Sequence, residues 1–272
     1  MACVGDMRQA VLRRWLRSDN LRASARRACP IVFMKHPKVK FKIDTTKDLR
    51  TFRAFVNDSK YDGGRSLRWG IFRKHPSVCR FMNDRKRVDA YIRSIYKKRA
   101  GDMAEALEFY RKQWKAKENV FFSLTDKLFP GFFWPKGKYI AYLTIWSMFP
   151  RFLEDKTFQI PFRYRRKKYV NVIIAHEMLH FIFYEWFYKQ YPRYRQPRYN
   201  YFVWNVSEIF NVLIQDSYPW IRTFGMKTMP YPEHKKIIRR IGLAWAESRP
   251  VGRLVEDIIL KVKKEPALRR FS

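Results

Sequence analysis

The stretch "NVIIAHEMLHFIFY", residues 171–184, places two histidines and a glutamate inside an otherwise apolar run. Apolar residues cover nearly every helical face from Val170 to about Tyr188, and Pro192 follows, so the pattern predicts a helix that passes through a core. Burying imidazole or carboxylate groups without partners is costly. The stretch therefore predicts that the fold supplies partners for its three polar groups, His176, Glu177 and His180.

The spacing of these three residues indicates what the partner is. His176 and His180 are four residues apart, so they project from the same face of a helix, with Glu177 one step around it. Two imidazoles in this arrangement can hold one zinc ion, and the glutamate can reach a water molecule beside it. The H-E-x-x-H pattern thus predicts one Zn²⁺ ion, with Glu177 as general base. The alternative is a core helix whose two histidines are simply hydrogen-bonded.

A catalytic zinc ion usually has three protein ligands, so a third ligand is expected elsewhere in the chain. The segment 201–217 is bounded by prolines and is amphipathic, with a polar face made of Asn205, Glu208, Asn211 and Gln215. Glu208 lies at the centre of this face. We predict Glu208 as the third ligand. An acid on a solvated helix face is the alternative.

Three other residues have side chains that can bind a metal and lie near these segments. Asp216 and His234 are the reserve candidates. Glu185 is a poor candidate, because nine residues separate it from His176 on one helix and turn it to the opposite face.

These motifs resemble those of gluzincin-type zinc metallopeptidases. The resemblance rests on "IIAHEMLHFI" and on the downstream "SEIFN", and it covers residues 139–217. The metzincin pattern would need a glycine and a histidine where Phe183 and Trp186 stand, and the H-G-x-x-F element of Spartan/SprT-like proteases is absent from the sequence. The gluzincin resemblance implies a zincin-like α+β fold. In that fold a small sheet packs on the active-site helix, a second helix bears the third ligand, and additional helices surround them.

The resemblance also implies an activity and supporting residues. It implies hydrolysis of a peptide or protein substrate by a metal-activated water, with Glu177 moving the proton. Asn205 and Asn211, about one turn either side of Glu208, are expected to hydrogen-bond the ligands. Candidates to stabilise the oxyanion are Tyr218, Tyr231 and His234.

The charge of the chain keeps a second class of function open. Fifty-eight lysines and arginines against 24 acids give a net charge of +34, which attracts polyanions. Aromatic residues lie among the basic ones, as in "YKQYPRYRQPRYNYF" at 188–202, a mixture that can stack bases. The alternative function is therefore a nucleic-acid-binding protein whose zinc site is structural or vestigial, or a protease acting on nucleic-acid-bound proteins. A solvated basic surface would explain the charge without any such function.

The chain is expected to contain three parts, divided near the Pro/Gly-rich "FPGFFWPKGK" at 129–138. They are a basic N-terminal extension (1–30), a mostly helical region of unknown role (31–130) and the zincin-like domain (131–272). We expect an extended segment at 31–43 and strands at 139–150 and 156–162. Strand 139–150 is expected either at the edge of the sheet, where it would pair with an extended substrate, or at its centre. Helices are expected at 45–58, 83–99, 102–128, 170–188, 201–217, 234–247 and 251–264.

The sequence also gives expectations about the compartment. No stretch of 18 or more residues is free of polar groups, so no transmembrane segment is expected. The three cysteines form no C-x-x-C pair and no signal-type apolar region precedes them, which favours the cytoplasm. The N-terminal stretch is rich in arginine, and in a eukaryotic source it would suggest the mitochondrial matrix instead.

Overall fold

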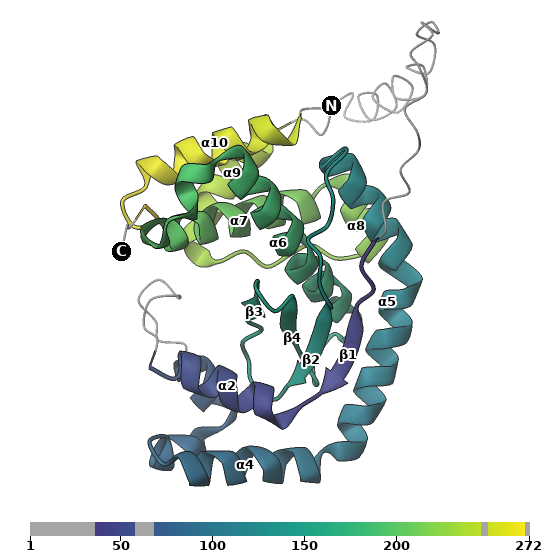
Figure 1. Ribbon diagram of the computed structural model, residues 1–272, viewed down its shortest axis with the longest axis vertical. Helices are drawn as coiled ribbons and strands as arrows, with labels where there is room; N and C mark the ends of the chain where they lie inside the picture. Colours follow the sequence, from purple (N-terminus) through teal and green to yellow (C-terminus); the bar gives the residue numbers. More distant parts are fainter. Residues whose placement is uncertain (1–35, 58–67, 246–249, 270–272) are drawn as a thin grey trace, which may run out of the picture. The chain divides into compact units, whose positions relative to one another are not determined.

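The structure is a computed structural model of the chain, and it describes residues 36–57, 68–245 and 250–269. The expected N-terminal extension therefore lies outside the described residues. Residues 36–272 group into one compact unit. The described part is a mixed α+β fold, in which a small four-stranded sheet is surrounded by helices (Figure 1).

The elements follow one another along the chain as strands, α-helices (α) and short 3₁₀ helices (η). Their bounds are β1 Lys40–Ile43, α2 Thr45–Phe55, α3 Arg68–Lys74, η1 Pro76–Phe81, α4 Arg85–Lys98, α5 Ala100–Leu128, β2 Ile140–Thr144, β3 Arg151–Phe152, β4 Thr157–Pro161, η2 Lys167–Tyr169, α6 Val170–Gln190, η3 Pro192–Arg195, η4 Pro197–Tyr199, α7 Asn200–Gln215, α8 Tyr218–Phe224, η5 Pro232–His234, α9 Lys235–Ala244 and α10 Val251–Lys264.

The sheet has the strand order β1-β2-β4-β3. β1 pairs with β2 and β2 with β4 in parallel, whereas the short β3 pairs antiparallel with β4, with Arg151 opposite Phe158. The strand expected at 139–150 is thus β2, which is shorter than expected and central in the sheet. The edge beside β4 is formed by β3, which the sequence pattern did not indicate.

The two faces of the sheet are covered by different helices. Phe158 of β4 points to one face and packs against Phe181 of α6, with ring centroids 6.2 Å apart. The next residue, Gln159, points to the other face and hydrogen-bonds Asp48 and Thr51 of α2. This alternation is the two-residue period of a strand buried on both sides. The sheet therefore separates α6 from α2.

A fully buried polar group, here called the Asp48 cluster, anchors α2 and α4 to the sheet. It consists of Asp48, Thr51, Tyr96, Gln159 and the backbone N–H of Ile145. The carboxylate of Asp48 accepts hydrogen bonds from Gln159 Nε2 at 2.8 Å, Tyr96 OH at 2.8 Å and Ile145 N at 2.9 Å. Thr51 completes the cluster by donating to Gln159 Oε1 at 2.9 Å. All three hydrogen bonds that the Asp48 carboxylate accepts thus come from donors within the protein.

Helix α6 confirms the prediction drawn from residues 171–184. Within α6 only Glu185, Lys189 and Gln190 are exposed, so the helix passes through the core. Helix α7 packs against it, and residues 202–215 of α7 are all buried. The polar face of α7 therefore faces protein rather than solvent, and the alternative of a solvated acid at Glu208 is wrong.

Most of the expected elements are found, with shifts of a few residues at their ends. The expected helices correspond to α2, α4, α5, α6, α7, α9 and α10, although residues 246 and 247 lie outside the described residues. Strand β1 precedes the expected domain boundary near 130 and pairs with β2, which follows it. Helix α5 packs on α6 across the same boundary. Among the described residues, no helix has the length and apolarity needed to cross a membrane.

Candidate metal centre

Three polar side chains meet where α6 packs on α7. His176 and His180 of α6 and Glu208 of α7 each offer one ligand atom, and these atoms lie within 4.8 Å of one another. It is the one group of three or more potential metal ligands within the described residues. His180 and Glu208 are buried, and His176 is partly exposed. The structure thus brings together the three ligands predicted from the sequence.

The distances suit a single small cation. His176 Nε2 lies 3.0 Å from Glu208 Oε2, and His180 Nε2 lies 3.3 Å from Glu208 Oε1. Ligand atoms about 2 Å from a tetrahedral zinc ion are separated by roughly 3.3 Å. Two imidazoles and one carboxylate are also a common donor set for catalytic zinc, with one position left open. The residues present therefore fit a zinc ion.

The ring of His176 is oriented by Gln215, at the end of α7. Gln215 Nε2 donates to the carbonyl of Val172 at 3.0 Å, so its Oε1 is free to accept from His176 Nδ1 at 2.8 Å. This bond fixes the proton on Nδ1 and leaves Nε2 for a metal. Sequence analysis placed Gln215 on the polar face of this helix without assigning it a role. Its position seven residues after Glu208, two turns along the same face, was the signal.

His180 is fully buried. Its Nε2 is close to Glu208 Oε1, at 3.3 Å, but within the described part of the chain neither ring nitrogen makes a hydrogen bond. Burial lowers the pKa of His180 well below its usual value, and the guanidinium of Arg151 lowers it further. The ring is therefore neutral near pH 7. A neutral imidazole with unsatisfied nitrogens is the form in which histidine binds a metal.

Glu177 lies beside the ligands and is also buried. Burial raises its pKa to about 7. Its Oε2 has no hydrogen-bond partner among the described residues and lies 3.8 Å from Arg151 Nη1. A carboxyl group with a pKa near neutrality can both accept and return a proton.

Arg151 is the residue of this site that sequence analysis missed. It comes from the edge strand β3, and its Nη1 donates to Glu208 Oε1 at 3.0 Å. Its Nη2 donates to the hydroxyl of Tyr184 at 3.4 Å, and the guanidinium lies 5.6 Å from the centre of that ring. Its side chain is only 12% exposed. Arg151 follows the predicted strand directly, and nothing in the sequence pattern separated it from the many basic surface residues.

The charges of the centre are strongly coupled. Burial pushes the pKa of Glu208 up, but the charge of Arg151 and the hydrogen bond from His176 outweigh it and hold this pKa well below its usual value. Burial likewise pushes the pKa of His176 down, and the hydrogen bond and charge of Glu208 leave it raised. Glu208 is therefore ionised, as a metal ligand must be.

The two asparagines of α7 have different surroundings. Asn211 Nδ2 donates to the backbone carbonyl of His176 at 2.9 Å, so this side chain fixes α6 rather than a ligand side chain. Asn205 instead donates to the carbonyls of Tyr201 and Leu268, and its Oδ1 lies 2.7 Å from His234 Nε2. Of the two, only Asn211 contacts a predicted metal ligand within the described residues.

The remaining candidates lie outside the ligand group. His234 is buried against Asn205 and Trp204, and Tyr231 packs edge-on against Trp204. Tyr218 is 65% exposed at the start of α8. Of the two reserves for the third ligand, Asp216 instead accepts a hydrogen bond from Thr228 N, and His234 is not in the group. The exposed position of Glu185 agrees with the prediction that it faces away.

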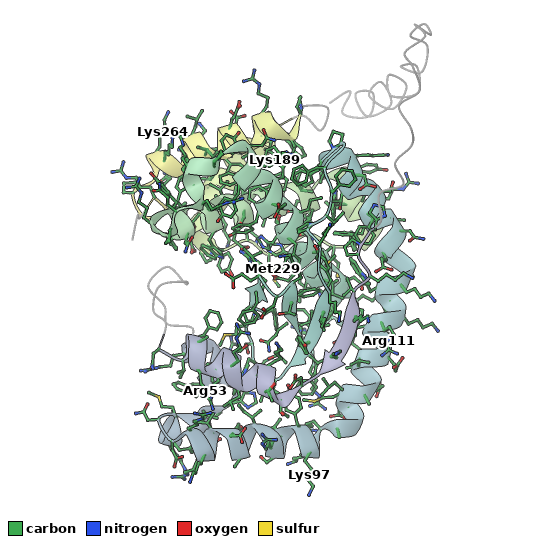
Figure 2. The ribbon with its side chains drawn as sticks, viewed as in Figure 1. Arg53, Lys97, Arg111, Lys189, Met229 and Lys264 are labelled. Carbon is green, nitrogen blue, oxygen red and sulfur yellow. The ribbon has the colours of Figure 1, made fainter. Side chains whose placement is uncertain are left out.

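Basic side chains are spread over the surface rather than gathered at the centre. The labelled cations of Figure 2 come from five different helices, α2, α4, α5, α6 and α10. All five are exposed: Arg53, Lys97, Arg111, Lys189 and Lys264. A separate hollow of about 430 Å³ lies on α9; basic residues alone line it, and none of the metal ligands does.

Comparisons with protein-family models, with curated proteins and with solved structures find no match to this chain.

Proposed function

We propose that the protein is a zinc-dependent metallopeptidase with a zincin-like fold of gluzincin type. One observation carries the proposal: the ligand atoms of His176, His180 and Glu208 lie within 4.8 Å of one another, beside the buried Glu177. The unsatisfied nitrogens of His180 support it, since buried polar groups are normally paired. A structural zinc site would not need the open position or the adjacent base.

Each residue of the centre has a separate role. His176, His180 and Glu208 would hold the ion, and Gln215 keeps the His176 ring in the required orientation. A zinc ion held there would lower the pKa of a water molecule and polarise a carbonyl group. Glu177 takes a proton from the water and passes it to the leaving amine, because its raised pKa suits both transfers. The substrate is a peptide or a protein.

The test is hydrolysis of an unbiased peptide mixture, followed by mass spectrometry. The zinc-loaded protein should generate new peptide termini, and a chelator should stop this. Glu177→Gln should retain zinc but lose hydrolysis by roughly 10²–10⁴-fold, the usual range for a general base. Equal cleavage by the wild type and Glu177→Gln would reject this role for Glu177. Glu185→Gln is the matched control, because it changes an exposed glutamate of the same helix.

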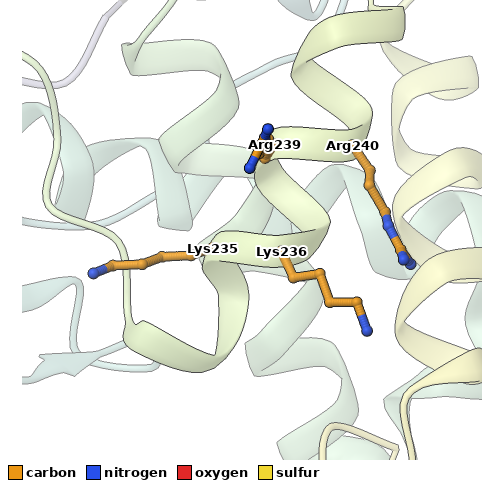
Figure 3. Close-up of a pocket in the computed structure, with 4 residues that line it drawn as sticks. All are labelled: Lys235, Lys236, Arg239 and Arg240. Carbon is orange, nitrogen blue, oxygen red and sulfur yellow. The ribbon is translucent and has the colours of Figure 1, made fainter.

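A second candidate function, polyanion binding, is favoured by the hollow on α9. Figure 3 shows four basic side chains extending from the first two turns of this helix. The first turn contains no acid, and cations at a helix N-terminus oppose the helix dipole. Lys236 is partly compensated by Glu265, 3.7 Å away. A phosphate-rich polymer such as nucleic acid would offset that repulsion. The four residues are Lys235, Lys236, Arg239 and Arg240.

A salt titration of binding to single- and double-stranded DNA tests this candidate. Reversing the charge of Lys235 and Arg239 should weaken binding more than the same change at Lys112 and Lys115, which are exposed on α5. Equal losses from both pairs, with steep salt dependence and no strand preference, would mean that the charge is only a surface property.

A further inference from the structure

Arg151 stands out because a cation occupies a site built for another cation. Its guanidinium lies 3.0 Å from Glu208 and 3.8 Å from Glu177, the predicted ligand and the predicted base. The contact with Tyr184 adds a hydrogen bond and an aromatic face. Arginine is the residue best suited to such a buried carboxylate site. The same two carboxylates would face a divalent ion.

The ligand His176 is held in place without Arg151. His176 is held by Gln215 through its ring and by Asn211 through its carbonyl. These contacts join α6 to α7, whereas Arg151 reaches the site from β3. Arg151 contacts one of the three ligands, Glu208, to which it brings a charge as well as a hydrogen bond.

The charge has opposite effects on the two forms of the protein. Without a metal, Glu208 and Glu177 place two acids in a buried site, and Arg151 offsets part of their burial cost. With a divalent ion present, the acids are already neutralised, and Arg151 adds like-charge repulsion at short range. Two cations that neutralise the same acids compete, and the competition is reciprocal.

We propose that Arg151 is a resident counter-cation of the metal centre, which stabilises the metal-free protein and lowers its affinity for Zn²⁺. The proposal rests on the metal site of the proposed function, but it does not depend on any peptidase activity. The protein then folds without metal and holds its ligands in place until an ion arrives. A residue that merely positioned Glu208 would have the opposite effect, because its removal would weaken zinc binding.

The test is the affinity for Zn²⁺, measured by competition with a chromophoric chelator at one pH, together with the thermal midpoint of the metal-free protein. Arg151→Met should bind Zn²⁺ about tenfold more tightly than the wild type or better, because the nearby like charge is gone. Its metal-free midpoint should fall, and zinc should raise that midpoint more than it does in the wild type. Arg151→Lys keeps the charge and should bind Zn²⁺ within about threefold of the wild type.

The matched control is Arg50→Met. Arg50 also donates to an acid, Asp155, at 3.0 Å and lies over an aromatic ring, that of Phe152, but its side chain is 55% exposed. An exposed pair contributes little, so neither the zinc affinity nor the midpoint should change measurably.

Each outcome decides the matter. Weaker or unchanged binding by Arg151→Met would overturn the proposal while leaving the metal site intact. Failure of the wild type and of both folded Arg151 variants to bind Zn²⁺ would reject the site and the proposal together. If Arg151→Met does not fold without metal, the zinc affinity of Arg151→Lys tests the proposal instead. Zinc binding by Arg151→Lys more than about tenfold weaker than that of the wild type would show a geometric role and overturn the proposal.

Discussion

Among the described residues, carboxylates are buried in two places, the Asp48 cluster and the metal centre, and their surroundings differ. In the Asp48 cluster, the carboxylate accepts hydrogen bonds from a glutamine, a tyrosine and a backbone N–H. In the metal centre, Glu177 Oε2 and both nitrogens of His180 lack hydrogen-bond partners among the described residues. The Asp48 cluster therefore has its hydrogen-bond partners within the protein, whereas the metal centre lacks some of its partners.

This difference separates a structural polar cluster from a functional one. A buried network contributes to stability when its members are satisfied, and unsatisfied members impose a cost. The metal centre bears such a cost, which a bound ion would remove. Substitutions in the Asp48 cluster should therefore lower stability. Replacing the unpartnered ligand His180 should instead lower metal affinity and stabilise the metal-free protein.

The largest effect is expected from Asp48→Leu. This change leaves the buried donors of Gln159, Tyr96 and Ile145 without their acceptor, at about 1–3 kcal/mol for each group that finds no replacement. We expect the free energy of unfolding in urea to fall by about 4 kcal/mol. Asp89→Leu, which breaks an exposed ion pair with Arg93 on α4, should cost well under 1 kcal/mol. Similar losses of unfolding free energy in both variants would show that the Asp48 cluster contributes no more to stability than an exposed ion pair.

The next effect is a pH dependence that also comes from Asp48. Burial raises the pKa of Asp48 from 3.8 to about 6, despite the hydrogen bonds that favour the charged form. Because the folded pKa exceeds the unfolded one, this group's contribution to stability is fully present below about pH 4 and is lost as the pH rises through 6. Asp48→Asn cannot ionise, so its stability relative to the wild type should improve by about 3 kcal/mol between pH 4 and pH 7.5. A constant difference in unfolding free energy across that range would contradict the assignment.

A smaller effect is expected from Gln215→Leu in the metal centre. The variant loses the hydrogen bond that orients His176, and such losses typically weaken metal binding by about 10- to 100-fold. Asn205→Ala changes a residue of the same helix that hydrogen-bonds Tyr201, Leu268 and His234 instead. Its zinc affinity, from the same chelator competition, should stay near that of the wild type. A larger loss in Asn205→Ala than in Gln215→Leu would reverse the roles given to these residues.

The smallest effect is expected from His180→Leu, and it is a gain in stability rather than a loss. Removing two buried nitrogens that make no hydrogen bond should raise the unfolding free energy of the metal-free protein by about 1 kcal/mol. The 3.3 Å contact with Glu208 is lost, but Glu208 keeps its bonds to Arg151 and His176. The same substitution at His75 should lower it, because that ring contacts Ile145 O at 3.0 Å and Tyr91 OH at 2.9 Å. If both histidine variants were destabilised equally, the distinction between the two clusters would fail.

The sequence was sufficient to predict the ligand-bearing helices. An apolar run interrupted by three polar groups marks α6, and a polar face on an apolar helix marks α7. Both signals are local, since helical periodicity shows directly which residues share a face. The meeting of Glu208 with the histidines followed from the ligand number of zinc rather than from any contact visible in the sequence.

Side-chain contacts between segments far apart in the sequence could not be predicted from the sequence. The Asp48 cluster links residues 48, 96, 145 and 159, and no periodicity relates them. Arg151 depends on a two-residue edge strand, too short to produce a pattern. The oxyanion candidates stay predictions: Tyr218 is exposed, and Tyr231 and His234 pack against Trp204.

The most direct test of the metal centre is the zinc content of the purified protein after dialysis, measured by elemental mass spectrometry. We expect one zinc ion per chain in the wild type and almost none when His176 and His180 are both replaced by alanine. Glu177→Gln should retain the full amount, because this residue acts on the water and does not hold the ion. A folded wild-type protein that binds no stoichiometric zinc would contradict the account.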